Sequence, residues 1–151
     1  MRAIVLTGAG RGFCAGQDVN SFQNLADHDV GAHLLAYYKP LIELIRAVEK
    51  PVIGALNGVA AGAGASLALA CDLRLMAESA SLVLAFSNIG LIPDAGATWF
   101  LVRLVGYSRA FEIAAEGGRI SAARCLALGL TNRVAADEAL AGEAQAWGES
   151  L

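Results

Sequence analysis

Short apolar runs alternate along this chain with longer stretches in which apolar residues recur at helical spacing. The runs predict five strands, at residues 3–7, 52–56, 73–76, 82–86 and 131–134. The first run is stopped by Gly8-Ala9-Gly10 and has the form of a strand that is buried on both faces. Strands separated by helices are typical of an α/β fold.

Spacing and caps mark the helical stretches. Apolar residues from Leu34 to Val48 recur every three or four positions and predict one buried helix face, which Pro40 is expected to kink. The spacings of Trp99, Phe100, Leu101 and Leu104 fit one buried helix face, so core packing is expected for Trp99, with the lining of a ligand pocket as the alternative. Further helices are predicted from Gly64 to Ala70, from Asp94 onwards, over 108–115, from Ser121 to Leu128 and at the C-terminal end. No linker or repeat divides residues 1–151, which predicts a single domain.

The apolar excess of the composition raises the question of a membrane. Apolar residues make up 56% of the chain, the mean hydropathy is +0.54, and residues 51–71 form an uncharged stretch long enough to span a bilayer. Pro51, Asn57 and several glycines interrupt that stretch, and a broken segment would expose its backbone to lipid. We therefore expect no membrane span, and interpret the excess as surface that packs against a partner or against further chain.

Charged and metal-binding residues exclude several function classes. The net charge is −3, the pI is near 5.3, and the 11 lysines and arginines do not cluster, so nucleic acid is not an expected partner. Cys14, Cys71 and Cys125 lie far apart in the sequence, which predicts neither a zinc site nor a disulfide framework and fits a reducing cytoplasm. His28 and His33 lie in a polar stretch, so surface positions are expected for them and no metal is predicted.

Two glycine-containing loops are the first candidate chemistry. Residues 13–18, Phe-Cys-Ala-Gly-Gln-Asp, and residues 57–64 have few bulky side chains, so their backbone N–H groups can approach a ligand. The glycines at 8, 10 and 12 do not have the dinucleotide-binding spacing, and Gly62-Ala63-Gly64 alone also fits close packing of a helix on a strand. Together, the loops favour two converging backbone donors for a thioester carbonyl that becomes an enolate.

A third segment places an acid where a helix is predicted to begin. Residues 92–96 read Ile-Pro-Asp-Ala-Gly. Asp94 has two interpretations of similar weight, an N-cap that accepts hydrogen bonds from the helix or an acid/base that transfers a proton.

The three segments resemble the crotonase (enoyl-CoA hydratase/isomerase) family, and the resemblance covers nearly the whole chain. Residues 92–96 followed by Thr98-Trp99 look most like the isomerases of the phenylacetyl-CoA pathway, which act on a ring-epoxide thioester. The resemblance implies a ββα spiral core that lacks the N-terminal strands and the C-terminal trimerisation helices usual in relatives. It also implies an acyl-CoA substrate with no other cofactor, and a homo-oligomer, either a trimer or a hexamer.

The resemblance also assigns site residues. The two oxyanion-hole amides fall at Gln17 and Ala63, both through the backbone, so the Gln17 side chain is expected to be a solvated loop group of little importance. Asp94 falls on the catalytic acid/base of the isomerases. The substrate-binding positions implied by the same motifs are Ala15, Gly16, Asp18, Val19, Gly62, Gly64, Phe86 and Trp99. Asp18 also fits a turn residue or helix cap.

Departures from the hydratase pattern decide the expected reaction. The positions of the two hydratase glutamates read Ser66 and Phe86, and neither activates water as a carboxylate does. Ser66 is expected to hydrogen-bond within its own helix, and Phe86 to desolvate Asp94 and raise its pKa. We therefore predict an isomerase that shifts a double bond or opens a ring epoxide. The alternatives are a hydratase, a dehalogenase-type enzyme with Asp94 as nucleophile, and an inactive acyl-CoA-binding or assembly subunit.

Overall fold

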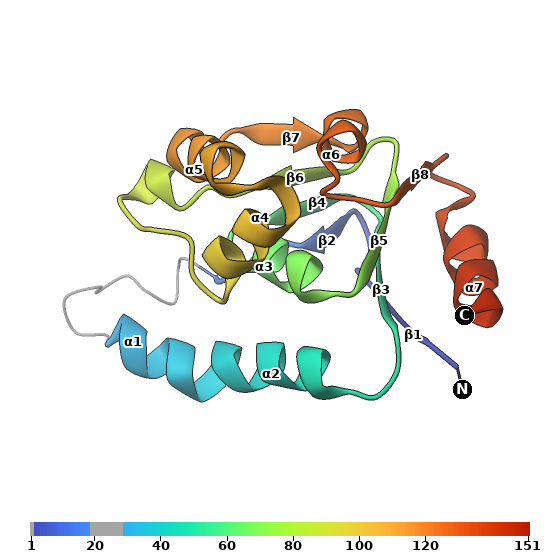
Figure 1. Cartoon of the computed structure of the whole chain (residues 1–151), viewed down its shortest axis with the longest axis horizontal. Helices are drawn as coiled ribbons and strands as arrows, with labels where there is room; N and C mark the ends of the chain where they lie inside the picture. The colour runs from blue at the N-terminus through green and yellow to red at the C-terminus, as the bar shows by residue number, and fades with distance from the viewer. Residues whose placement is uncertain (1, 19–28) are drawn as a thin grey trace.

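Two four-stranded sheets organise residues 2–18 and 29–151, the part of the chain that this computed structural model describes (Figure 1). One sheet is parallel, in the order β1 (Ile4–Thr7), β3 (Val52–Leu56), β5 (Leu73–Ala77) and β8 (Arg133–Ala135). The other has the order β2 (Gly12–Cys14), β4 (Val59–Ala61), β6 (Ser81–Val83) and β7 (Arg119–Ser121). In this second sheet β7 runs antiparallel to β6.

The chain passes from one sheet to the other in repeated turns. β1 leads to β2, β3 leads to β4 and then to helix α3 (Ala63–Ala70), and β5 leads to β6. Each turn pairs in parallel with the one before it, so that Ile4 lies opposite Val52 in the first sheet and Val59 lies opposite Ser81 in the second. The predicted ββα spiral and α/β class are therefore confirmed.

The strand predictions hold for the first sheet and are incomplete for the second. β2, β4 and β7 have three residues each, too few to show a period in the sequence. The predicted strand at 82–86 is wrong beyond Val83, because the chain then turns into the 3-10 helix η4 (Ser87–Ile89). Phe86 adopts helical backbone angles at the start of this turn, and its side chain is buried.

Helix α3 lies at the centre of the core between the sheets and the outer helices. All of its residues except Leu67 are buried. Its small side chains allow a close approach to β2, since a Cβ on Gly64 would lie 2.3 Å from the carbonyl oxygen of Cys14. Large apolar side chains with no solvent exposure surround it, among them Ile53, Leu56, Leu75 and Leu82. Burial of each such side chain stabilises the fold by roughly 1.5–3 kcal/mol.

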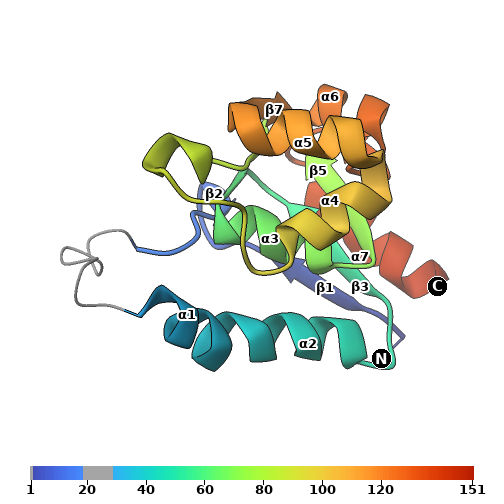
Figure 2. The ribbon, with the colours of Figure 1, turned by 60° about the vertical axis from the view of Figure 1, so that its left-hand side comes forward.

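One continuous helix with a change of pitch runs along a side of the molecule, below α3 in Figures 1 and 2. It consists of α1 (Val30–His33), the π-helical turn η3 (Leu34–Tyr38) and α2 (Lys39–Ala47). Pro40 stands in the first turn of α2, so the irregularity is a π-turn before the proline instead of a kink at it. The buried face expected here is wrong in part, since Leu35 and Leu41 are 64% and 41% exposed.

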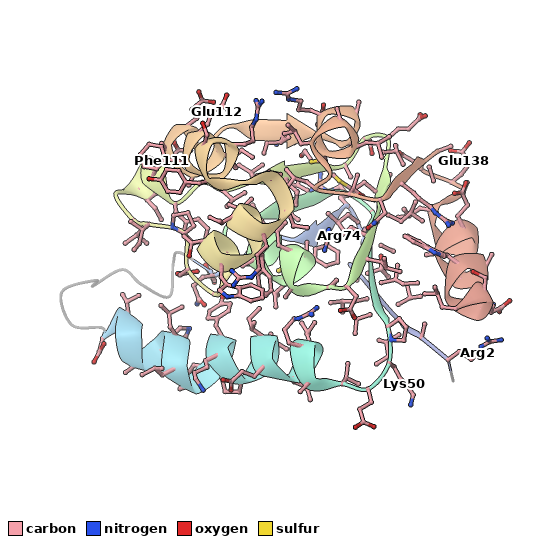
Figure 3. The ribbon with its side chains drawn as sticks, in the orientation of Figure 1. Arg2, Lys50, Arg74, Phe111, Glu112 and Glu138 are labelled. Carbon is pink, nitrogen blue, oxygen red and sulfur yellow. The ribbon has the colours of Figure 1, made fainter. Side chains whose placement is uncertain are left out.

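Arg74 of β5 is a buried cation that the sequence patterns did not single out. Its side chain lies in the interior, at the centre of Figure 3. Nε donates a hydrogen bond to the carbonyl oxygen of Leu130 at 2.7 Å, and a terminal nitrogen donates to that of Cys71 at 2.6 Å. Thr131 Oγ1 donates in turn to the carbonyl oxygen of Arg74. The guanidinium therefore joins the turn before β5 to the loop that precedes β8.

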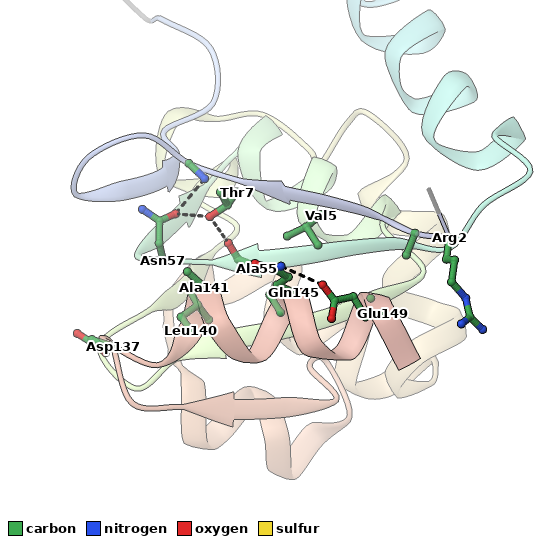
Figure 4. A pocket seen from close by; sticks show the side chains of 14 residues that line it. Arg2, Val5, Thr7, Ala55, Asn57, Asp137, Leu140, Ala141, Gln145 and Glu149 are labelled. Atoms are coloured by element: carbon green, nitrogen blue, oxygen red, sulfur yellow. Dashed lines mark hydrogen bonds between the residues drawn. The ribbon is translucent and has the colours of Figure 1, made fainter. Parts of the chain in front are cut away.

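Strand β1 is an edge strand, which contradicts the burial expected on both of its faces. Its residues alternate between half-buried and exposed, and Val5 is 41% exposed. The outer face opens into a cleft of about 800 Å³ beside helix α7 (Leu140–Ser150), shown in Figure 4. Thr7 Oγ1 donates to the carbonyl oxygen of Ala55 at one end of this cleft. An apolar run alone does not distinguish an edge strand from a central one.

Helices α4 (Ala97–Val105), α5 (Tyr107–Glu116) and α6 (Ala122–Leu128) complete the layer on the other side of α3. Core packing of Trp99 is wrong, because this side chain is 51% exposed and lies under the Arg103 guanidinium, 3.6 Å from the ring centroid. Among the described residues, no helix combines the length and apolarity that a membrane crossing needs.

Candidate active site

The two glycine loops lie against each other. Gly16 has a φ of 86°, and a Cβ there would lie 2.7 Å from the carbonyl oxygen of Ala61 and 3.1 Å from the nitrogen of Ala63. Gly64 packs equally closely on the carbonyl group of Cys14. Glycine is required at both positions, since a side chain would push the loops apart. The fold therefore brings the two predicted loops together.

The amide of Ala63 is the first N–H of α3. Gly62, with a φ of 53°, turns the chain into the helix, and its own amide donates to the carbonyl oxygen of Val83. The amides of Ala65 and Ser66 both donate to Gly62. In the part of the chain that the structure describes, the Ala63 amide has no hydrogen-bond partner, as is usual in the first turn of a helix. It is positioned to bind an anionic oxygen at the positive end of α3.

The Gln17 amide follows Gly16 directly in the chain, so it lies beside this helix terminus. The Gln17 side chain is half-buried, which contradicts the solvated position expected for it. Its carbonyl oxygen accepts a hydrogen bond from the Tyr38 hydroxyl at 2.9 Å and lies 3.1 Å from Nε2 of His33. The surface position expected for His33 holds only in part, because its ring is half-buried in this contact.

Asp94 is not a helix cap. The helix predicted from Asp94 begins at Ala97, and Gly96 is its N-cap. Between them Ala95 has a φ of 46°, and an alanine in this left-handed region costs on the order of 1 kcal/mol or more. Asp94 Oδ1 is buried and has no hydrogen-bond partner among the described residues. Burial raises the pKa of Asp94 above its usual 3.8, which is typical of groups that exchange protons.

Ser66 links the backbone of Asp94 to helix α3. Its hydroxyl donates to the carbonyl oxygen of Asp94 at 3.0 Å, whereas the carbonyl oxygen of Gly62, within its own helix, is 3.5 Å away. The expected local hydrogen bond is thus the longer of the two contacts. Ser66 is fully buried, so this contact fixes the backbone of Asp94 relative to α3.

Tyr38 lies near both the first loop and Asp94. Burial raises the pKa of Tyr38, and the nearby Cys14 and Asp94 raise it further, so these side chains share one electrostatic environment. A cavity of about 350 Å³ lies between the long helix and the turn after Asp94, lined by Leu34, Leu35, Tyr38, Lys39, Ile42, Glu43, Ala95 and Gly96. The larger cleft beside α7 is lined by none of the predicted site residues.

The geometry assigns no role to the remaining predicted positions. Asp18 is exposed, Phe86 is 6% exposed, and Trp99 lies outside the lining of the 350 Å³ cavity. Val19 and His28 lie outside the described residues. Substrate binding by these residues stays a prediction. Within the described ranges, no three His, Cys, Asp or Glu side chains gather as a metal site would require.

The whole chain, residues 1–151, matches the family model described as enoyl-CoA hydratase/isomerase. The chain belongs to this family. Among enoyl-CoA hydratase/isomerase relatives, a 1,2-epoxyphenylacetyl-CoA isomerase of Escherichia coli is 48% identical over 149 residues, which are 96% of this chain and 56% of that protein. A probable enoyl-CoA hydratase of Rhodobacter capsulatus is 47% identical over 131 residues, which are 85% of this chain and 50% of that protein.

Solved structures of the enoyl-CoA hydratase/isomerase family confirm the crotonase-type fold. An enoyl-CoA hydratase from a Polaromonas species is 39% identical and superposes with a TM-score of 0.91, covering 99% of this chain and 59% of that one. The chain spans about half the length of the curated relatives it matches.

Proposed function

We propose that this chain carries the active site of an acyl-CoA isomerase, which shifts a double bond or opens a ring epoxide through an enolate-like thioester intermediate. The observation that supports it most is the Asp94 carboxylate, whose Oδ1 is buried without a partner among the described residues. Ser66 ties this residue to the helix that begins with the Ala63 amide. An acid beside backbone donors is what proton transfer next to a thioester carbonyl requires.

In the proposed reaction, the thioester oxygen lies between the amides of Gln17 and Ala63. Asp94 takes a proton from the carbon next to the carbonyl, and the electron pair of the broken C–H bond moves toward the thioester oxygen as an enolate. Asp94 then returns the proton to a different carbon, which shifts the double bond. Each backbone donor is expected to contribute roughly 10² to 10³ in rate. The raised pKa of Asp94 brings it closer to the range of an efficient acid/base.

Coenzyme A enters this proposal as part of the substrate. The proton that Asp94 removes is returned, and no electrons are gained or lost, so the proposed reaction includes no redox cofactor. The relative named as a 1,2-epoxyphenylacetyl-CoA isomerase supports the ring-epoxide thioester as one substrate class.

A hydratase is the second candidate, because a relative of nearly equal identity is named a probable enoyl-CoA hydratase. Water addition needs a group that accepts a proton from water. Ser66 directs its hydroxyl to the Asp94 backbone, and Phe86 is a buried apolar side chain. These contacts favour the isomerase. A dehalogenase-type reaction, with Asp94 as nucleophile, and a subunit that binds acyl-CoA without turnover are the further alternatives.

We also propose a cytoplasmic homo-oligomer, a trimer or a hexamer. Large apolar side chains are exposed on the long helix, on η4 and its following loop, and on α5, including Leu35, Leu44, Ile92 and Phe111. Such surface exceeds what isolated apolar residues on a monomer require. Sedimentation equilibrium is expected to show association at micromolar concentration, and a compact, stable monomer there would contradict this part of the proposal.

Product analysis tests the proposed function. The purified protein is offered 3-enoyl-CoA and 2-enoyl-CoA separately, and conversion of the 3-enoyl to the 2-enoyl thioester without 3-hydroxyacyl-CoA is expected. If hydration of 2-enoyl-CoA were the faster reaction, the result would favour the hydratase. Release of chloride from a chlorinated aryl thioester would favour the dehalogenase-type enzyme. Binding of both thioesters without turnover would leave the binding subunit.

A further inference from the structure

The π-helical turn η3 (Leu34–Tyr38) places two donors on one acceptor. The hydroxyl of Tyr38 donates to Gln17 Oε1 at 2.9 Å, and His33 Nε2 lies 3.1 Å from the same oxygen. Because a glutamine carbonyl oxygen is an acceptor, the contact assigns His33 the tautomer in which Nε2 carries the ring hydrogen. The centroids of the His33 and Tyr38 rings are 5.9 Å apart, so both rings converge on Gln17.

The change of helical pitch explains how residues five apart converge. In a regular α-helix their side chains would point about 140° apart around the axis. Here the amide of Lys39 donates to the carbonyl oxygen of Leu34, five residues earlier, which is the π-helical hydrogen bond. The wider turn moves His33 and Tyr38 toward a common face. π-turns cost stability relative to the α-helix and are frequent at functional sites.

The loop that receives these donors packs on the start of α3 through Gly16 and reaches the long helix through the Gln17 side chain. Ala15 is exposed, Gly16 has no side chain and adopts a left-handed φ of 86°, and Asp18 is exposed. Gln17 is half-buried and extends its amide group to the long helix. Because the peptide N–H and the side chain belong to one residue, the hydrogen bonds that hold the Gln17 side chain also restrain the position of its N–H.

We propose that Tyr38 is a positioning residue that acts through Gln17. With His33, it holds the Gln17 side chain from the π-turn, and so keeps the Gln17 peptide N–H aligned with that of Ala63 on the thioester oxygen. This inference rests on the proposed function. It gives the Gln17 side chain an importance that the sequence did not predict, because the oxyanion donor and its anchor belong to the same residue.

Two substitutions of the same hydrogen bond test this inference. Tyr38→Phe removes the donor and Gln17→Met removes the acceptor at similar size. Each is expected to lower kcat between about tenfold and 10²-fold through misplacement of one oxyanion donor. The double variant is expected to be no slower than the slower single variant, because both changes break one interaction. Tyr37→Phe is the matched control, since Tyr37 is the exposed neighbour on the same turn, and is expected to retain the wild-type rate.

Binding and spectroscopy separate this role from others. A conjugated aryl-acryloyl-CoA is expected to shift its absorption to longer wavelength on wild-type protein, as its carbonyl is polarised, and to shift less on both variants at similar Kd. If Gln17→Met kept wild-type kcat while Tyr38→Phe lost it, or if both variants kept the full absorption shift, the inference would be wrong. If wild-type protein gave neither turnover nor shift, the proposed function itself would fail.

Discussion

Arg74 and Asp94 are both charged side chains that are shielded from water, but they differ in their hydrogen bonds. The Arg74 guanidinium donates to the carbonyl oxygens of Leu130 and Cys71 from a fully enclosed position. Asp94 keeps a buried carboxylate oxygen without a partner among the described residues. A satisfied buried charge joins elements of the fold, whereas an unsatisfied one beside a cavity is available for chemistry. We therefore expect Arg74 to stabilise the fold and Asp94 to take part in the reaction.

Apart from substitution of Asp94 itself, the largest effect is expected on the oxyanion side of the site. Ala63→Pro removes the backbone donor and should lower turnover by roughly 10² to 10³. Proline is well tolerated at the first position of a helix, so circular dichroism and thermal unfolding should change little. Ala122→Pro makes the same change at the first position of α6 and should leave turnover per folded molecule intact. Equal, small losses from both variants would remove Ala63 from the oxyanion hole.

The substitution Arg74→Met tests whether the buried guanidinium stabilises the fold. Loss of the guanidinium leaves the carbonyl oxygens of Leu130 and Cys71 buried without donors, so the free energy of unfolding should fall by about 3 kcal/mol. Turnover per folded molecule should be unchanged at low temperature. Urea titration measures the first quantity, and steady-state kinetics the second. A variant that is stable but has low activity would show that Arg74 contributes to the reaction and not to the stability of the fold.

A smaller effect is expected at Ser66, whose hydroxyl joins helix α3 to the backbone of Asp94. Ser66→Ala removes the hydroxyl that donates to the Asp94 backbone, which should cost about 1 kcal/mol of stability and roughly tenfold in kcat. Ser121→Ala removes a helix cap at α6 and should cost a similar ~1 kcal/mol without a kinetic effect. Chemical denaturation and kinetics on both variants make the comparison. Identical kinetics in the two would show that Ser66 does not position Asp94.

The smallest effect is a pH dependence of stability. Because burial raises the folded-state pKa of Asp94 above 3.8, the folded protein binds this proton more tightly than the unfolded chain does. Wild-type stability should therefore fall as pH rises from about 4 through the folded pKa, and Asp94→Asn should not show this fall. The variant should be the more stable protein at neutral pH. Thermal unfolding at several pH values measures the difference, and a variant that is less stable at pH 7 would contradict the cost assigned to the buried carboxylate.

Much of the fold is visible in the sequence, for a physical reason. Strands β3 and β5 are buried in a parallel sheet, so their apolar runs are continuous and mark their positions closely. The edge position of β1 and the three-residue strands of the second sheet leave no such mark, since pairing partners and not side-chain periods define them. The exposure of apolar side chains on the long helix could not be predicted for a similar reason, because an apolar stripe in the sequence does not show which surface packs against it.

Some features of the candidate site could likewise be predicted from the sequence, and others could not. The loops around Gly16 and Ala63 could be predicted because glycine and a helix start are local signals of backbone chemistry. The contacts of Tyr38 with Gln17 and of Ser66 with Asp94 join residues 21 and 28 positions apart, and no local pattern encodes them. Asp94 was identified as a candidate, but the choice between cap and acid needed the backbone angles of the turn that follows it.

The most direct test of the central claim is turnover of 3-enoyl-CoA by Asp94→Asn. The amide is close in size to the carboxylate and cannot take and return a proton, so kcat should fall by about 10² to 10⁴ while acyl-CoA affinity remains. Asp137→Asn makes the same change at an exposed aspartate beside α7 and should keep the wild-type rate. A folded Asp94→Asn variant that isomerises 3-enoyl-CoA at the wild-type rate would show that Asp94 is not the acid/base.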